Sequence, residues 1–365
     1  MILAAMAALA LSAAPAETGR LPPAPRELYR IAWKKALVAG ELGDYQVLEM
    51  GGTAVDATGQ WVVVGTRDGW LHALRPDGAL AWEFKARGPF GATPLIEGGV
   101  VYAGSHDGNL YALELSTGAL RWKYEAREQL GTRPALVGGL VVVASLQDTV
   151  FAVDAASGAW KWHHRRDLHE GFTIQGAAAV VADGGSVYAA YSDGTVAALD
   201  GATGQPRWEQ HLAPAGSYQD IDSLALADGR LYAAAYSGAI LAVDAATGKT
   251  LWSQAWPTAS RVVHDRGSLL AVAGSEVLSL SARDGALAWK VPLGAGAASG
   301  SLQVAGRWLL VPAGMDGGLR FFEAASGRLL RVLDAGSGSS STPGLRGGRV
   351  YVLSNGGVLL ALDLQ

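Results

Sequence analysis

The chain has 365 residues, half of them apolar, and a formal net charge of −4 at pH 7. This composition supplies enough apolar side chains for a large core and suggests no polyanion-binding surface, so we expect no nucleic-acid partner. The chain contains no cysteine, which excludes disulfides, thiolate metal sites, thiol nucleophiles and a lipid anchor on cysteine. Its 49 glycines and 12 tryptophans are typical of an all-β protein with many tight turns.

The first residues predict export. Residues 2–14 form an almost unbroken apolar run, and Ala14-Pro15-Ala16 is a small-residue cleavage site. We interpret residues 1–16 as a cleaved signal peptide, the alternative being a hydrophobic tail on a cytosolic protein. Residues 17–30 are proline-rich and are predicted to be a linker, and residues 31–365 to be a single domain. No later run approaches the ~18 unbroken apolar residues of a membrane-spanning helix.

One sequence unit recurs along most of the chain. Residues 101–122 read VYAGSHDGNLYALELSTGALRW, and residues 187–208 and 231–252 are close copies. In each copy a glycine stands four residues before a tryptophan. The six pairs are Gly78/Trp82, Gly118/Trp122, Gly158/Trp162, Gly204/Trp208, Gly248/Trp252 and Gly285/Trp289. Their spacing is around the period of a four-stranded propeller blade.

Two partial copies complete the count. Residues 309–331 have Arg331 where the tryptophan should be, and residues 350–363 stop before their last strand. We predict the missing strand at residues 31–33, which contain Trp33. A ring closed in this way has no open sheet edge. The sequence therefore predicts an all-β, eight-bladed β-propeller of four-stranded antiparallel blades, closed by the N-terminal strand.

Strands can be placed within one unit. Alternation and turn residues predict strands at residues 93–96, 100–105, 110–115 and 119–124, with an Asp-Gly turn in the middle. We predict no helix. Because isolated sheets this small are marginal, each blade must bury a face against its neighbour.

The repeated tryptophan has two interpretations: a stacking ladder for a ligand, or packing between blades. Packing is favoured because the residue recurs once per blade on the outer strand, and its indole N–H then needs a backbone acceptor. The predicted docking tryptophans are Trp33, Trp82, Trp122, Trp162, Trp208, Trp252 and Trp289. We expect Asp154, Asp200 and Asp244, each four residues before a glycine, to accept hydrogen bonds within their turns rather than bind a metal.

The frame Ala-x-Asp-x-x-x-Gly-x-x-x-Trp occurs at residues 152–162, 198–208 and 242–252. It resembles the tryptophan-docking motif of quinoprotein-type (PQQ-like repeat) propellers, and the resemblance covers almost the whole mature chain. It implies the fold and says little about function.

Two branches of that superfamily compete. The resemblance to its quinone-dependent dehydrogenases implies a cofactor held beneath a disulfide of adjacent cysteines and a Glu/Asn/Asp metal set. The disulfide is impossible here, and we identify no metal or base constellation, so we expect no enzyme, no cofactor and no metal. The alternatives left open are a quinone-dependent oxidoreductase or small-ligand binder using the central channel, and a general cell-envelope interaction module.

The second branch is the propeller lipoprotein of the outer-membrane β-barrel assembly machinery, which the chain resembles in size and blade number. That family docks the periplasmic repeat domain of the barrel-inserting subunit through a Leu-x-Leu-Arg-Gly and a Ser-Asp-x-Asp segment. Residues 172–176 (FTIQG) and 219–222 (QDID) stand at these positions. The resemblance implies two apolar anchors, a glutamine replacing the family's arginine, and two charged partners. These partner-binding residues are Phe172, Ile174, Gln175, Asp220 and Asp222.

Simpler interpretations exist for each segment. Phe172 and Ile174 fit ordinary burial, and Asp220 and Asp222 fit turn chemistry. Residues 163–170 contain three histidines, for which solvation or partner contact is favoured over a metal site. Residues 334–342 are expected to form a flexible connection. The resemblance thus implies a monomeric periplasmic scaffold of barrel-protein assembly, without a lipid anchor on cysteine.

Overall fold

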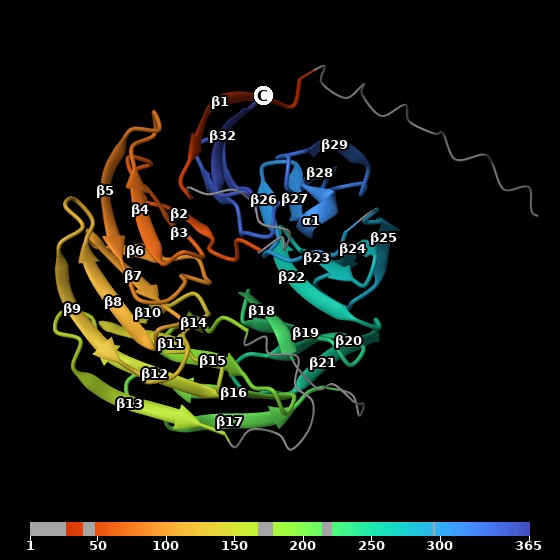
Figure 1. The fold of residues 1–365 in the computed structure, drawn as a ribbon. Coiled ribbons are helices and arrows are strands. Elements are labelled where there is room, and N and C mark those ends of the chain that lie inside the picture. The colour runs from red at the N-terminus through yellow and green to blue at the C-terminus, as the bar shows by residue number, and fades with distance from the viewer. Residues whose placement is uncertain (1–26, 39–47, 167–177, 214–220, 295) are drawn as a thin grey trace, which may run out of the picture.

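The computed structural model describes residues 27–38, 48–166, 178–213, 221–294 and 296–365. Eight sheets of four antiparallel strands are arranged in a ring (Figure 1). The first strands of successive blades contact one another around the centre, and the fourth strand of each blade lies at the perimeter. We call this fourth strand the outer strand. The eight-bladed, all-β prediction is confirmed.

The first four blades follow one another in the sequence. Their strands are β2 (Thr53–Val55), β3 (Val62–Gly65), β4 (Trp70–Leu74) and β5 (Leu80–Lys85) in blade 1; β6 (Leu95–Glu97), β7 (Val100–Gly104), β8 (Asn109–Glu114) and β9 (Leu120–Glu125) in blade 2; β10 (Ala135–Val137), β11 (Leu140–Ala144), β12 (Thr149–Asp154) and β13 (Trp160–Arg165) in blade 3; and β14 (Val181–Asp183), β15 (Ser186–Ala190), β16 (Thr195–Asp200) and β17 (Pro206–His211) in blade 4.

The remaining blades continue this order until the ring closes. Their strands are β18 (Ile221–Ala227), β19 (Arg230–Ala235), β20 (Ala239–Asp244) and β21 (Thr250–Ala255) in blade 5; β22 (Ala259–Asp265), β23 (Ser268–Ala273), β24 (Glu276–Ser281) and β25 (Leu287–Pro292) in blade 6; β26 (Gln303–Ala305), β27 (Trp308–Pro312), β28 (Leu319–Glu323) and β29 (Leu329–Leu333) in blade 7; and β30 (Gly344–Arg346), β31 (Arg349–Leu353), β32 (Val358–Leu364) and β1 (Tyr29–Ala36) in blade 8.

The described residues contain almost no helix. Within the described ranges only the four-residue α1 (Gly314–Gly317) forms, in a turn of blade 7. No helix among the described residues is long and apolar enough to cross a membrane.

Blade 8 joins the two ends of the described chain. β1 pairs antiparallel with β32, with Trp33 opposite Ala361, and the C-terminus lies beside β1 in Figure 1. Asp363 on β32 accepts from Arg349 at 2.6 Å and from Arg30 on β1 at 3.4 Å. The predicted closure by the N-terminal strand is confirmed.

The hydrophobic core lies between the blades. Eight clusters of buried side chains each span two neighbouring blades, one cluster at every junction of the ring. Middle strands such as β7 are buried along their whole length because a blade covers each face. No blade has a complete core of its own, which is why the repeat forms a ring and not a string of independent units.

Tryptophans of the outer strands cross these junctions. The indole N–H donates to a backbone carbonyl of the next blade, at 2.7 Å from Trp82 to Leu115 and at 3.0 Å from Trp162 to Gly201. The equivalent bonds of Trp33, Trp122, Trp208 and Trp252 measure 2.8–3.2 Å. A register shift immediately before the aromatic residue bulges the outer strand, as between Ala112 and Leu113 on the partner of β9.

Each indole lies on a glycine, which belongs to the next blade. Gly118 of blade 2 lies under Trp82 of blade 1, and Gly204 of blade 4 under Trp162 of blade 3. At these two glycines φ is +73° and +72°, and a Cβ atom there would come within 2.7 and 2.5 Å of the indole. Both the left-handed backbone and the close approach require glycine. The glycine and tryptophan of one repeat therefore serve two different junctions.

This arrangement explains Arg331, which occupies the tryptophan position of blade 7. A tryptophan there would need a glycine turn between the third and outer strands of blade 8. Those strands are β32 and β1, which are separated by the whole ring in sequence, so no hairpin turn joins them. Without that turn there is no glycine on which an indole at position 331 could pack.

The repeated aspartates of the Ala-x-Asp frame accept hydrogen bonds within their own turns. Asp154 accepts from the amide and hydroxyl of Ser157 at 3.0 and 2.9 Å, and Asp244 makes the same two bonds with Thr247. Hydrogen bonds from Arg207 and Thr203 lower the pKa of Asp200 to about 2. The turn interpretation of these three residues is confirmed.

The two rims of the ring differ. The connections between blades and the turns between second and third strands lie together: His106 of such a turn donates its amide to Pro89 of a connection, and Ala126 donates to Gly108. We call this rim the connection face.

Candidate functional site

The predicted partner-binding residues fall at two blade connections. Residues 167–177 lie between β13 and β14, and residues 214–220 between β17 and β18. Phe172, Ile174, Gln175 and Asp220 are therefore outside the described residues, and only Asp222 can be placed.

Asp222 is the second residue of β18, at a register shift between Ile221 and Ser223. Its side chain is 13% exposed, and Oδ2 lies 3.9 Å from Nη1 of Arg261 on the first strand of blade 6. Burial lowers the pKa of Arg261, and the Asp222 charge counteracts that effect. Asp222 therefore offsets the positive charge of Arg261 between the first strands of blades 5 and 6. The sequence did not predict this ion pair.

A salt-bridged brace supports the start of the first predicted segment. Arg166, the last described residue before it, contacts Asp193 at 2.8 Å and Glu209 at 3.1 Å. Asp193 lies in a turn of blade 4 and Glu209 on its outer strand β17, so a single guanidinium ties blade 3 to blade 4. Burial alone would raise the pKa of Asp193, but hydrogen bonds from Thr195 and Arg166 outweigh it and lower the pKa.

Polar contacts extend this brace toward the ring. The Nδ1 atom of His164 lies 2.7 Å from the hydroxyl of Tyr191, whose pKa burial raises. Asp148 accepts from the amide and hydroxyl of Ser192 on the next blade, and burial raises the pKa of its carboxyl group. One of the histidines suggested for a metal site is thus engaged with a tyrosine. Among the described residues no group of three His, Asp or Glu side chains is placed to hold a metal ion.

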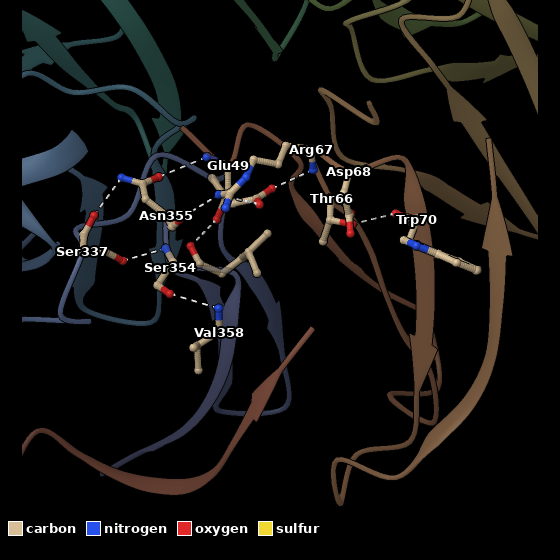
Figure 2. A network of polar contacts seen from close by, with 12 residues as sticks. Glu49, Thr66, Arg67, Asp68, Trp70, Ser337, Ser354, Asn355 and Val358 are labelled. Carbon is tan, nitrogen blue, oxygen red and sulfur yellow. Dashed lines mark hydrogen bonds and ion pairs between the residues drawn. The ribbon is translucent and has the colours of Figure 1, made fainter. Parts of the chain in front are cut away.

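A second polar cluster lies on the connection face where blade 8 meets blade 1 (Figure 2). Glu49 is fully buried; its carboxylate accepts from the Arg67 amide at 2.9 Å and lies 3.0 Å from Nη1 of Arg67. Arg67 also donates to the carbonyl of Asn355 at 2.7 Å, and the Asn355 side chain accepts from the Glu49 amide at 3.2 Å. We call these three residues the closure clasp.

The clasp continues into the connection between blades 7 and 8. Asn355 donates to the Ser337 carbonyl at 3.1 Å, and the Ser337 hydroxyl accepts from the Gly356 amide at 2.6 Å. Burial raises the pKa of Glu49 to about 7, although the Arg67 amide and charge act in the opposite direction. The clasp is suited to holding the ring shut in a pH-dependent way, and it offers no nucleophile.

Sequence reasoning missed the clasp because Glu49 and Asn355 are 306 residues apart. It also misjudged residues 334–342, which were expected to be flexible. Ser339, Ser340 and Ser341 are at most 1% exposed, and the hydroxyls of Ser339 and Ser341 donate to the Leu353 carbonyl at 3.0 and 2.9 Å. The flexible assignment is wrong because the small polar side chains fill a tight space and satisfy a backbone acceptor.

Comparison with known proteins decides the family. The sequence profile of outer membrane protein assembly factor BamB matches residues 27–115, 96–275 and 273–365. The chain belongs to the BamB family. A search of curated proteins finds no match.

Solved structures agree on the fold. BamB from Moraxella catarrhalis superimposes with a TM-score of 0.79 at 22% identity, over 92% of this chain and 100% of that one. The quinohemoprotein alcohol dehydrogenase ADHIIG from Pseudomonas putida HK5 gives 0.72 at 15% identity, over 92% and 76%. The computationally designed Ika8 protein gives 0.69 at 17% identity, over 88% and 97%. At these identities the likeness shows the fold that BamB shares with the dehydrogenases.

Proposed function

We propose that this chain is a periplasmic scaffold of outer-membrane β-barrel assembly that binds the barrel-inserting subunit and catalyses no reaction. The observation that carries the proposal is the BamB family match, which extends over residues 27–365. Binding alone would be its mechanism: a rigid ring presents a few anchors and orients a partner. Residues 1–16 would direct export, and without a lipid anchor on cysteine the protein would be held at the membrane by its partner.

The proposed docking surface comprises Phe172, Ile174, Gln175, Asp220 and Asp222, of which the mostly buried Asp222 also pairs with Arg261. Its support is the position of their flanking residues. β13 and β17, which lead into the two connections, are outer strands of adjacent blades, and Arg166 bridges directly to Glu209 on β17. Because the two connections start from adjacent blades that Arg166 links, both can contact the same partner. We propose that this partner is the periplasmic repeat domain of the barrel-inserting subunit.

A pull-down from envelope extracts tests this function. Tagged wild-type protein should recover the barrel-inserting subunit, and Ile174→Ser combined with Asp220→Asn should reduce recovery about tenfold or more, as expected for loss of hot-spot residues. The matched control combines Leu287→Ser, an exposed apolar residue of β25, with Asp183→Asn, an exposed acidic residue of β14, and should recover it normally. No recovery with wild type would refute the proposal.

The second candidate function is a quinone-dependent oxidoreductase, favoured only by the fold shared with the dehydrogenases. Adding pyrroloquinoline quinone and calcium to the purified protein distinguishes it. We expect no stoichiometric uptake in the absorbance spectrum and no dye-linked alcohol oxidation; both together would establish the enzyme instead.

A further inference from the structure

A groove lies between the outer strands of blades 1 and 2, at the edge of the connection face. Its volume is about 560 Å³, within the range of clefts that hold small ligands or a few side chains, about 300–1,000 Å³. Four cationic and two anionic side chains line it. These are Lys85, Arg87, Lys123 and Arg127, with Asp107 and Glu125. The groove is therefore positive in a chain whose overall charge is −4.

Two of the cations form no salt bridge within the described part of the chain. Among the described residues no carboxylate forms a salt bridge with Arg87 or with Arg127. Lys123 has a partner, the exposed Glu125, at 2.8 Å. Lys85 is held in place differently: it donates to the Asp68 carbonyl, and its ammonium lies 4.9 Å from the centre of the Trp70 ring.

One carboxylate that lines the groove, that of Asp107, already accepts hydrogen bonds from the protein. Asp107 accepts from the Tyr111 hydroxyl at 2.7 Å, from the Asn109 amide at 3.1 Å and from the Arg87 amide at 3.1 Å. Burial alone would raise the pKa of Asp107, but these bonds outweigh it and lower the pKa. Asp107 thus stays ionised and directs its lone pairs at the protein, which leaves the guanidinium of Arg87 for another acceptor.

The junction of blades 3 and 4 has a salt bridge at the equivalent place. Asp193 occupies the turn position of Asp107, and Glu209 pairs with β16 where Lys123 pairs with β8. There Arg166 closes the space by bridging Asp193 and Glu209. At the junction of blades 1 and 2, Ala86 stands where Arg166 does and Lys123 where Glu209 does, so the salt bridges of that brace have no counterpart there. The positive charge of the groove comes from Lys85, Arg87, Lys123 and Arg127.

We propose that this groove binds an extended acidic segment of another polypeptide, whose carboxylates pair with its cationic side chains. Guanidinium groups pair with carboxylates through two parallel hydrogen bonds, which suits Arg87, two residues after the end of β5, and Arg127, two residues after the end of β9. Leu120, 50% exposed beside the groove, adds apolar contact that a peptide can use. The fixed charges of Asp107 and Glu125 disfavour a uniformly charged polyanion, and a recessed groove disfavours a flat membrane. The proposal is independent of the docking function above.

Fluorescence anisotropy with defined peptides tests it. The probes are a labelled ten-residue peptide of alternating Glu and Ser and the matching Gln/Ser peptide, added to the mature protein. The Glu peptide should bind about tenfold more tightly than the Gln peptide, and higher salt should weaken it because exposed charges are screened. Arg87→Gln with Arg127→Gln should lower its affinity about tenfold.

Two controls make the result decisive. Arg283→Gln with Arg331→Gln removes two exposed arginines elsewhere and should change affinity less than about twofold. If the double groove variant fails to fold, Arg87→Gln alone should still weaken binding. Equal binding of both peptides, or wild-type affinity in the groove variant, would overturn the proposal. So would groove-dependent binding of phosphatidylglycerol vesicles without peptide binding, which would assign the site to a membrane.

Discussion

The junctions of the ring are of two kinds. At seven of them a tryptophan lies on a glycine turn of the following blade, from Trp33 on Gly78 to Trp289 on Gly327. At the junction of blades 7 and 8 the position holds Arg331, and blade 8 has no turn to receive an indole. The exception occurs in the blade where the two chain ends meet. Because β1 closes this blade, no turn joins its last two strands, and the tryptophan motif is lost at the preceding position.

Other contacts hold that exceptional junction. Tyr29 of β1 stacks on Phe321 of β28, with ring centres 5.2 Å apart. Leu28 is almost fully buried in the same cluster. The buried hydroxyls of Ser339 and Ser341 bind a strand carbonyl of blade 8. The motif is thus one of several ways to join blades, and a junction without it depends on aromatic stacking and buried hydrogen bonds.

Trp162→Ala, at a junction with a docked tryptophan, should cause the largest loss of stability among these variants. It removes a side chain that is 5% exposed and leaves a cavity above Gly204, so we expect a loss of about 3–5 kcal/mol in the free energy of unfolding. Equilibrium denaturation in urea, followed by tryptophan fluorescence and circular dichroism, measures it.

The matched variant at the exceptional junction is Arg331→Ala, for which we expect a change within about 0.5 kcal/mol. Arg331→Trp should likewise gain nothing, because no glycine turn is present to receive the ring. If Arg331→Trp stabilised the protein as much as a docked indole does, the explanation from topology would be wrong.

Glu49→Gln tests what the closure clasp contributes at the junction of blades 8 and 1, which also has a docked tryptophan. The carboxyl pKa is raised from 4.5 to about 7 in the folded state, so the folded protein binds the proton more tightly. The stability this contributes is fully present below about pH 4.5 and is lost as pH rises through 7. Between pH 5 and 8 the wild type should lose up to about 3 kcal/mol relative to the variant.

Urea denaturation at both pH values measures this difference, with Glu97→Gln, an exposed glutamate, as control. Parallel pH profiles of wild type and Glu49→Gln would contradict the assignment of a buried, protonatable clasp.

Ser341→Ala should have a smaller effect, at the junction without tryptophan. The variant loses one buried hydrogen bond, to the Leu353 carbonyl at 2.9 Å, and leaves that acceptor with its bond from Ser339. We expect a loss of about 1 kcal/mol in the free energy of unfolding. No change at all in the urea midpoint would show that these serines only fill space.

Much of the fold was predictable because the repeat is visible. The spacing of Gly118 and Trp122 and the Asp-Gly turn placed four strands within one or two residues of β6 to β9, and the partial copies predicted closure. What spacing cannot show is which residues meet around the ring. That Gly118 serves Trp82 and not Trp122 follows only from the three-dimensional structure.

Less of the candidate site than of the fold could be predicted from the sequence. The family resemblance singled out two segments, but the ion pair of Asp222 with Arg261 joins different blades and has no local signal. The clasp joins Glu49 to Asn355 where blades 8 and 1 meet, although the two residues are far apart in the sequence. The serines of residues 339–341 have the composition of a flexible linker and are nevertheless buried. Polar contacts between segments that are distant in the sequence form only in the closed ring. A repeat predicts the ring but not which side chains meet in it.

Closure by β1 is the claim on which the rest depends, and a disulfide tests it directly. Arg30 and Asp363 are opposite each other in the register of β1 and β32, and the chain has no cysteine to interfere. Arg30→Cys with Asp363→Cys should oxidise to one intramolecular disulfide, seen as a faster-migrating monomer on a non-reducing gel. Arg30→Cys with Asp183→Cys, which pairs distant blades, should not. Two free thiols, or intermolecular dimers only, in the first variant would contradict the closed ring.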